Sequence, residues 1–482
     1  MPRRHIHVTA AADTPLRAAL RAMRTKLALP DTFPPAVLAE AEAAAKAPHL
    51  PEYDATDIPF FTIDPPTSKD LDQAMHLARR ADGGYRVHYA IADVGAFVAP
   101  GGAIDAEAHK RATTVYLPDG KVPLHPAVLS EGAASLLPGN TAPALLWRID
   151  LDAEGRTVAT DVRRALVRSL TKLSYASAQA QIDAGTAEEP LALLPHVGRL
   201  REALEIERGG VSLAVPEQEV VEAGGSYTLE YRAPLRVDGW NEQISLLTGM
   251  AAADLMTAAG TGILRTLPPA PDGSVARLRH SAKALGIDWP HHMSYAELIR
   301  SLDPGNSRHA AFLQDATSLL QGSAYTPFTG GHVPEHAVHA AIADEYTHCT
   351  APLRRLVDRY TGELCLAAVA GTAPPEWVLR AMDKLNAEMG AGMKLARKAE
   401  RMSVDIVEAA VMSNRIGETF DSVLIDKEVV PHLGLVGIAH LEEPAVIGVV
   451  VPDGAELPLG EHLRVRLTQA DPGRKVVQFV PA

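Results

Sequence analysis

The segment TIDPPTSKDLDQA, residues 62–74, carries three aspartates within nine residues, and apolar stretches flank it on both sides. The apolar run 60–63 that leads into it predicts a buried strand, and the following Pro-Pro turn is able to bring Asp64 back beside the other two acids. Asp70 and Asp72 are two residues apart, so both point to one face of an extended segment. Hard divalent cations take oxygen ligands, and a cation relieves the repulsion among clustered carboxylates. We therefore predict a magnesium site here. An acidic surface loop without a role is the alternative, and the apolar flanks argue against it because unpaired charge is costly there.

The pattern on either side of this segment predicts three regions. Alternating apolar residues over 75–91, with a turn at 82–84, indicate a β-hairpin, and a mixed α/β region continues to about residue 415. Two short helices before residue 50 predict a small basic module of helix-turn-helix type. After Gly417, five short β segments separated by turn residues favour a small barrel. The predicted domains are 1–50, 51–416 and 417–482.

Composition sets further limits on the class of protein. The chain has 482 residues, 47% of them hydrophobic, and a formal net charge of −13. No apolar run approaches the length of a membrane helix, and no signal peptide is expected. The only cysteines, Cys349 and Cys365, predict two buried thiols in a reducing cytoplasm. The acidity argues mildly against a nucleic-acid partner, but basic residues cluster in 1–26, 163–172 and 394–401.

The acidic segment also belongs to a longer series of motifs. TIDP at 62–65 and KDLD at 69–72, together with YTHCTAPLRR at 346–355, resemble the ribonuclease II and R family, whose catalytic domain is called RNB. Further similar segments occur in the same order: 90–94, 116–118, 172–175 and 240–243. The resemblance covers residues 57–415, and it implies an RNB domain of mixed α/β type. The segment 417–482 resembles an S1-type OB fold, a common single-strand binder.

The resemblance implies an activity: processive, magnesium-dependent 3′-to-5′ hydrolysis of single-stranded RNA to nucleoside 5′-monophosphates. Manganese is a second possible cofactor. It also implies roles for individual residues: Asp64, Asp70, Asp72 and Gln73 as metal ligands, Arg354 at the scissile phosphate, Tyr116 and Tyr175 stacked on bases, Glu242 near the 3′ end, and Arg355 and Phe420 as further RNA contacts.

The chain departs from the family pattern in several places. Gln73 stands where the family usually has a fourth aspartate, Ala351 and Leu356 replace a serine and a tyrosine, and 210–213 lacks the aromatic base clamp. The N-terminus has no room for the family's cold-shock barrels. We therefore expect a less enclosed channel entrance that admits RNA with some secondary structure and a 3′ overhang.

Two alternatives stay open at this point. One is an RNA-binding protein of the same fold that is catalytically impaired by Gln73, and the other is a metal-dependent hydrolase of a small phosphodiester. In every case we expect a monomeric cytoplasmic protein that does not associate with membranes.

Overall fold

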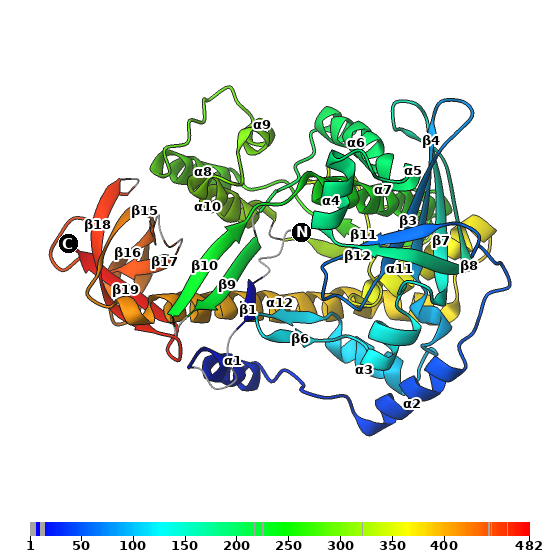
Figure 1. Ribbon diagram of the computed structural model, residues 1–482, viewed down its shortest axis with the longest axis horizontal. Coiled ribbons are helices and arrows are strands. Elements are labelled where there is room, and N and C mark those ends of the chain that lie inside the picture. Colours follow the sequence, from blue (N-terminus) through cyan, green and yellow to red (C-terminus); the bar gives the residue numbers. More distant parts are fainter. Residues whose placement is uncertain are drawn as a thin grey trace.

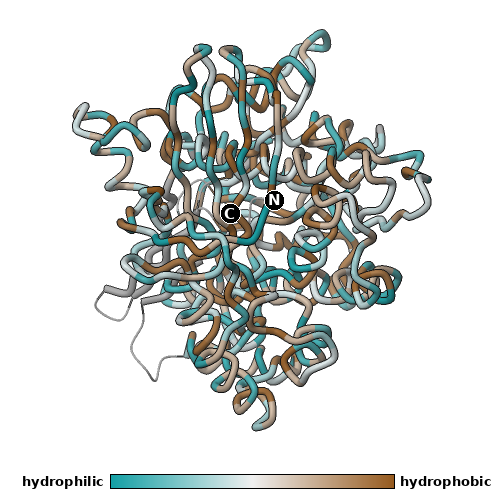
Figure 2. The backbone as a smooth tube through the Cα atoms, turned by 90° about the vertical axis from the view of Figure 1, so that its right-hand side faces the viewer, coloured by the Kyte–Doolittle hydropathy of each residue, from teal (hydrophilic) through white to brown (hydrophobic). Residues whose placement is uncertain are grey.

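A computed structural model describes residues 6–9, 15–215, 217–223, 226–320, 322–441, 444, 446–459 and 461–482. Its elements form an α/β body with a β-barrel at one end (Figure 1). Figure 2 shows hydrophobic and hydrophilic stretches alternating along the chain, as expected for elements with one buried face. Among the described residues, no helix combines the length and the apolar character that a membrane crossing requires.

The α/β body is built on a closed five-stranded barrel in the order β2-β3-β4-β7-β8. The strands are β2 (Phe60–Ile63), β3 (Gln73–Arg79), β4 (Tyr85–Ala92), β7 (Thr141–Leu151) and β8 (Thr157–Leu173). The predicted hairpin is confirmed, because β3 and β4 pair antiparallel from Gln73 opposite Ile91 to Arg79 opposite Tyr85. Strand β2 closes the barrel by pairing parallel with β8. That closure was not predicted.

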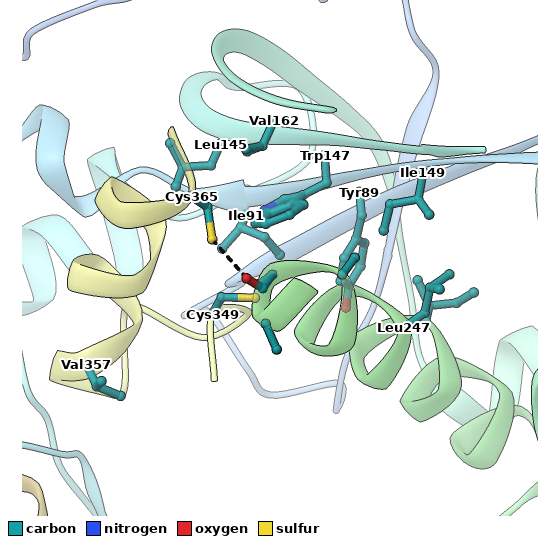
Figure 3. Close-up of a cluster of buried hydrophobic side chains, with 14 of the residues drawn as sticks. Tyr89, Ile91, Leu145, Trp147, Ile149, Val162, Leu247, Cys349, Val357 and Cys365 are labelled. Atoms are coloured by element: carbon teal, nitrogen blue, oxygen red, sulfur yellow. Dashed lines mark hydrogen bonds between the residues drawn. The ribbon is translucent and has the colours of Figure 1, made fainter. Parts of the chain in front are cut away.

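One face of the barrel wall packs against helices. Val87, Tyr89 and Ile91 alternate along β4 and are each at most 1% exposed. They lie against α7 (Arg236–Ala259) and α11 (Leu356–Ala370), in a cluster that includes Trp147 (Figure 3). Both cysteines lie in this cluster as free, buried thiols, so their predicted burial is confirmed.

Helix α12 (Glu376–Met412) connects the α/β body to the second barrel. Its first half contributes Met382 and Leu385 to the core of the α/β body, and its last turns contribute Ala409 and Met412 to the core of the C-terminal barrel. The predicted five-stranded barrel is confirmed as a closed sheet in the order β15-β16-β17-β19-β18. Its strands are β15 (Thr419–Val430), β16 (Gly434–Leu441), β17 (Ile447–Val450), β18 (His462–Asp471) and β19 (Val476–Pro481).

The N-terminal segment contains the two expected helices, α1 (Pro15–Lys26) and α2 (Pro35–Lys46). They do not pack on each other as a helix-turn-helix would, because α1 lies in a cluster with α12 whereas α2 lies in a cluster beside α3 (Ala103–Arg111). Strand β1 (Ile6–Thr9), which was not expected, pairs parallel with β9 (Glu217–Ala223).

The remaining elements connect these parts. They are β5 (Val115–Leu117), β6 (Gly120–Val122), α4 (Tyr175–Asp183), α5 (Glu189–Ala192), α6 (Leu194–Arg208), β10 (Ser226–Arg232), β11 (Gly262–Thr266), α8 (Asp272–Ala284), α9 (Tyr295–Ser301), α10 (Ser307–Ala316), β12 (Ala324–Phe328), β13 (Val338–His339), β14 (Asp344–Glu345), and the short helices η1 (Val94–Ala96), η2 (Leu129–Ala133), η3 (Thr317–Leu320) and η4 (Ser413–Arg415).

Gly249 on α7 provides a test of this packing. A Cβ added there would lie 2.1 Å from the Tyr346 ring and 2.6 Å from the Thr347 carbonyl oxygen. We expect Gly249→Ala to lower the free energy of unfolding by about 1–3 kcal/mol through overpacking, measured by urea denaturation. Gly390→Ala on α12 is the matched control, because a Cβ there meets nothing within 4 Å. That substitution should leave stability unchanged or raise it by up to about 1 kcal/mol, since alanine favours the helix. Equal effects of the two substitutions would contradict the packing.

Candidate active site

The two motifs that lie furthest apart in the sequence meet at Asp72. This residue immediately precedes β3 and is 5% exposed. One of its carboxylate oxygens accepts a 2.8 Å hydrogen bond from the backbone N–H of Leu353, which lies 281 residues further along the chain. The other lies 3.4 Å from Nε of Arg354. The structure therefore places the acidic segment and the arginine motif in one site.

The backbone around the other two acids is held by neighbouring side chains. Lys172, at the end of β8, donates from its ammonium group to the carbonyl oxygens of Pro66 (2.8 Å) and Ser68 (2.5 Å). The Ser135 hydroxyl accepts from the Leu71 N–H at 2.9 Å and donates to the Lys69 carbonyl at 2.6 Å. These bonds hold the main chain of the loop between Asp64 and Asp72. They do not involve the carboxylate groups, which remain available for other contacts.

Lys121 supplies the cation for Asp70. Its ammonium group lies 2.9 Å from the Asp70 carboxylate and 2.9 Å from that of Glu131. Lys121 is on β6, directly opposite Tyr116 on β5. One short hairpin therefore carries both the predicted stacking tyrosine and the charge partner of an acid.

Burial sets the protonation of the two acids that face the arginine. Burial raises the pKa of Asp72 to about 7 and that of Asp64 to about 6, although the positive charge of Arg354 opposes both shifts. Burial lowers the pKa of Arg354, but the adjacent Tyr116 and Asp72 outweigh it and the net direction is upward. Because these pKa values lie close to neutral pH, binding of a cation shifts the Asp64 and Asp72 carboxyl groups to their ionised forms.

A divalent ion fits these residues only in part. In the described ranges, no three His, Cys, Asp or Glu side chains converge closely enough to form a metal cage. Magnesium usually keeps several waters and binds through one or two carboxylates plus substrate phosphate oxygens. Asp64 and Asp72 match that donor set, since Asp72 is buried and Asp64 half-buried, both beside Arg354 and next to Asp70.

Gln73 takes the place of the family's fourth aspartate and makes a bond that a carboxylate cannot make. Its amide nitrogen donates to the carbonyl oxygen of Thr350 at 2.5 Å. The Thr350 hydroxyl in turn lies 2.9 Å from the hydroxyl of Ser245 on α7. An aspartate at 73 would face the Thr350 carbonyl with a second acceptor, so the glutamine joins the two motifs instead of adding charge.

Arg355 is directed away from the acids and shapes its own loop. It pairs with Asp358 at 3.0 and 2.8 Å, and Asp358 also accepts from the Ala351 N–H at 2.7 Å. Asp358 is 1% exposed. Of the two adjacent arginines, Arg354 therefore faces the acidic segment and Arg355 stabilises the turn that presents it.

The predicted RNA contacts divide into two groups. Tyr116 and Tyr175 both lie next to Arg354, and the Tyr175 hydroxyl accepts from Asn241 at 3.5 Å. Glu242, the next residue on α7, is exposed and lines an adjoining cavity. Phe420 instead is 5% exposed inside the C-terminal barrel, edge-to-face with Phe479. Because that ring offers little surface to a base, we leave Phe420 out of the RNA-binding set.

Sequence reasoning missed the residues that support the site. Lys121, Ser135 and Asp358 were not singled out. A signal existed for Lys121, since Pro118-Asp119-Gly120 is typical of a tight turn that pairs the flanking residues. A signal also existed for Asp358, which lies three residues after Arg355 and begins an apolar helix, where an acid is favoured.

Two known domain families match this chain. The RNB domain matches residues 52–370, and the RNase II-type exonuclease C-terminal S1 domain matches residues 418–482. The chain belongs to the RNB family. Its expected resemblance to the exoribonucleases of this family is thereby confirmed, and the activity of that class is hydrolysis of RNA.

Two curated relatives carry the same name. Ribonuclease R of Aquifex aeolicus is 27% identical over 94% of this chain and 69% of its own length. Ribonuclease R of Escherichia coli is 26% identical over 82% of this chain and 52% of its own length. The chain thus spans between about half and two thirds of these proteins.

The fold also matches a solved structure. Apo ribonuclease R of Mycoplasma genitalium superposes with a TM-score of 0.81 at 20% identity, covering 98% of this chain and 78% of that one. Structures of the same protein with ribose-methylated single-stranded RNA and with double-stranded RNA give TM-scores of 0.81 and 0.78.

The Asp358–Arg355 pair gives a test of the arginine turn. Asp358→Ala leaves a largely buried guanidinium unpaired, so we expect a loss of about 3–5 kcal/mol in unfolding free energy by urea denaturation. Arg355→Met should cost less, and adding it to Asp358→Ala should recover part of the loss because the orphaned charge is removed. Additive losses in the double variant would contradict the pairing.

Proposed function

We propose that this RNB protein is a magnesium-dependent, processive 3′-to-5′ exoribonuclease that degrades single-stranded RNA to nucleoside 5′-monophosphates. The observation that carries the proposal is the joining of Asp72 to Leu353 and Arg354. It sets a buried carboxylate, able to hold a cation, beside a guanidinium of fixed orientation. Phosphodiester hydrolysis needs both, because negative charge develops on the phosphate while a water attacks it.

Each side chain has a defined task in this proposal. Asp64 and Asp72 would hold the magnesium ion, with Asp70 beside them and Gln73 as a neutral neighbour, and manganese would serve in the same place. The metal would supply an activated water and stabilise the leaving oxygen. Arg354 presents planar donors to the scissile phosphate. Tyr116 and Tyr175 stack on bases of any sequence, and Glu242 accepts from the terminal ribose.

The first test is digestion of 5′-labelled single-stranded RNA with magnesium. The wild type should give a ladder that shortens from the 3′ end, and Asp72→Asn should abolish it. Arg354→Met should lower kcat by about 100- to 1,000-fold, as removal of a transition-state donor does. Arg380→Met is the control, because Arg380 lies exposed on α12, where it pairs with Glu376 of the same helix. Intact RNA, tightly bound by the wild type, would favour a catalytically impaired binding protein. Cleavage of dinucleotides as fast as long RNA would favour a small-phosphodiester hydrolase.

The raised pKa values predict a pH-dependent response to magnesium. Both folded-state values, about 6 for Asp64 and about 7 for Asp72, lie above the ordinary aspartate value. These groups therefore stabilise the metal-free fold at low pH, and that contribution is lost as the pH rises to about 7. Magnesium binds the ionised forms, so it should raise Tm more at pH 8 than at pH 5.5.

Thermal unfolding with magnesium, against sodium chloride of equal ionic strength, measures this difference. Asp72→Asn should remove most of the magnesium response at pH 8. An equal Tm shift at both pH values would contradict the assignment of the ion to these acids.

We further propose that RNA with a 3′ overhang is degraded into its paired region. The similarity in fold to a ribonuclease R whose structure was solved with double-stranded RNA supports this. A labelled duplex with a single-stranded 3′ tail should yield products shorter than the duplex, whereas arrest several nucleotides before the duplex would argue for an enclosed entrance. We also propose a monomer in the cytoplasm, where the two buried thiols stay reduced.

A further inference from the structure

Lys121 is a half-buried cation that lies between two acids at the candidate active site. Its ammonium group is 2.9 Å from the carboxylate of Asp70 and 2.9 Å from that of Glu131, and 24% of its side chain is exposed. The lysine belongs to β6, whereas Glu131 belongs to η2 and Asp70 to the loop that precedes β3. Three segments of the chain therefore meet at one ammonium group.

The β5–β6 hairpin directs this ammonium group toward the acids. Tyr116 and Lys121 are partners across the hairpin, so both side chains leave it on the same face. Tyr116 lies next to Arg354, whose Nε is 3.4 Å from the carboxylate of Asp72. An ammonium group and a guanidinium group therefore flank the same acidic segment, one at Asp70 and the other at Asp72.

The balance of charge around the acidic segment favours a single divalent ion. Among the described residues, four acids and three bases interact here: Asp64, Asp70, Asp72 and Glu131 with Arg354, Lys121 and Lys172. When every one of these acids is ionised, one divalent cation already offsets the excess of negative charge. A second divalent cation would leave the site strongly positive, and like charges a few ångströms apart repel each other.

The ligands that remain lead to the same number of ions. Hydrolysis with two metal ions requires a second ion about 3.5–4 Å from the first, with carboxylates to hold both. The Asp70 carboxylate already has the Lys121 ammonium group, and Gln73 is neutral, with its amide nitrogen on the Thr350 carbonyl. Asp64 and Asp72 are left, and two carboxylates suit one magnesium ion.

We infer that this chain holds one divalent ion, on Asp64 and Asp72, and that the Lys121 ammonium group takes the place of a second ion. The inference rests on the proposed function, because it specifies the metal site used there. Lys121 is a positioning residue in this arrangement: it neutralises Asp70 and keeps that carboxylate from binding another metal ion. Since the lysine is part of the hairpin, this cation stays in the site when magnesium is scarce.

A count of bound manganese ions tests the inference without RNA. The paramagnetic resonance signal of free manganese is lost when the ion binds, so titration of the full chain counts the ions. Wild type should bind one ion. Lys121→Ala should bind two, because Asp70 and Glu131 are then free to hold a second ion, and two ions about 3.5–4 Å apart should give the broadened spectrum of a coupled pair. Lys121→Arg should restore the count to one, since it restores a cation.

The matched control is Lys110→Ala. Lys110 lies on α3, its side chain is 73% exposed, and its ammonium group is 3.5 Å from the Glu107 carboxylate. This variant also removes a lysine from an acid, but the acid is not part of the metal site. It should therefore bind one manganese ion, as wild type does.

The magnesium dependence of RNA digestion gives a second readout. The initial rate of wild type should follow a simple hyperbola as magnesium is added, whereas Lys121→Ala should need more magnesium and give a sigmoidal curve, because a second ion then has to bind. A lysine that only stabilises the hairpin would lower Tm when replaced, without a change in the ion count or in the shape of this curve.

The possible outcomes separate this inference from the proposed function. Thermal unfolding checks that each variant folds, and if Lys121→Ala does not, Lys121→Met keeps the packed stem without the charge and should also bind a second ion. Two ions in wild type, or one ion in a folded neutral variant, would overturn the inference and leave the proposed function standing. No bound ion in wild type would overturn both. One ion in wild type and two in Lys121→Ala, with RNA left intact by both, would support the ion count and overturn the proposed function.

Discussion

The hydrogen bond from the Leu353 N–H to the Asp72 carboxylate is the contact on which the site depends. It ties the start of a barrel strand to the loop that precedes helix α11, across 281 residues of sequence. Two further bonds support the same junction, from Gln73 to the Thr350 carbonyl and from the Ala351 N–H to Asp358. All three hydrogen bonds use main-chain atoms of residues 350–353. They therefore fix the loop without engaging the Arg354 side chain, which faces the acids. The barrel and the helices packed on it act as the frame that keeps these two loops in contact.

Charge in the site is distributed in pairs. Asp72 has Arg354, Asp70 has Lys121, and Asp358 has Arg355, so each of these three acids has a cation of its own. This pairing explains how several carboxylates stay close together before a metal or a phosphate arrives. It also explains why Asp64 and Asp72 retain raised pKa values, since Arg354 only partly offsets the cost of their burial. A metal ion bound together with a substrate phosphate would offset the remaining cost of burying the Asp64 and Asp72 carboxylates.

The sequence predicted what local pattern and motif can reveal. Alternation along residues 75–91 specified the β3–β4 hairpin, and turn spacing specified the C-terminal barrel, because both depend on neighbouring residues. The arginine motif could be linked to the acids only through the family resemblance, since no local signal spans that separation. Closure of the first barrel by β2 and β8 depends on long-range register in the same way. Phe420 shows a different limit of the sequence. The strand pattern singled out this aromatic residue as an RNA contact, but its inward direction depends on how the sheet closes into a barrel.

The N-terminal segment shows how a small module can affect a distant site. Helix α1 packs against α12 and the β5–β6 hairpin, and Arg24 pairs with Asp119 at the tip of that hairpin at 2.8 Å. The hairpin in turn brings Lys121 to Asp70 and Tyr116 to Arg354. A chain of contacts thus runs from the first helix to the acids, although the helix contributes no side chain to them. Since α12 also enters the C-terminal barrel, the same helix anchors both terminal modules to the catalytic frame. The two ends of the chain therefore contribute to the geometry of the site through packing, whatever contacts they make with RNA.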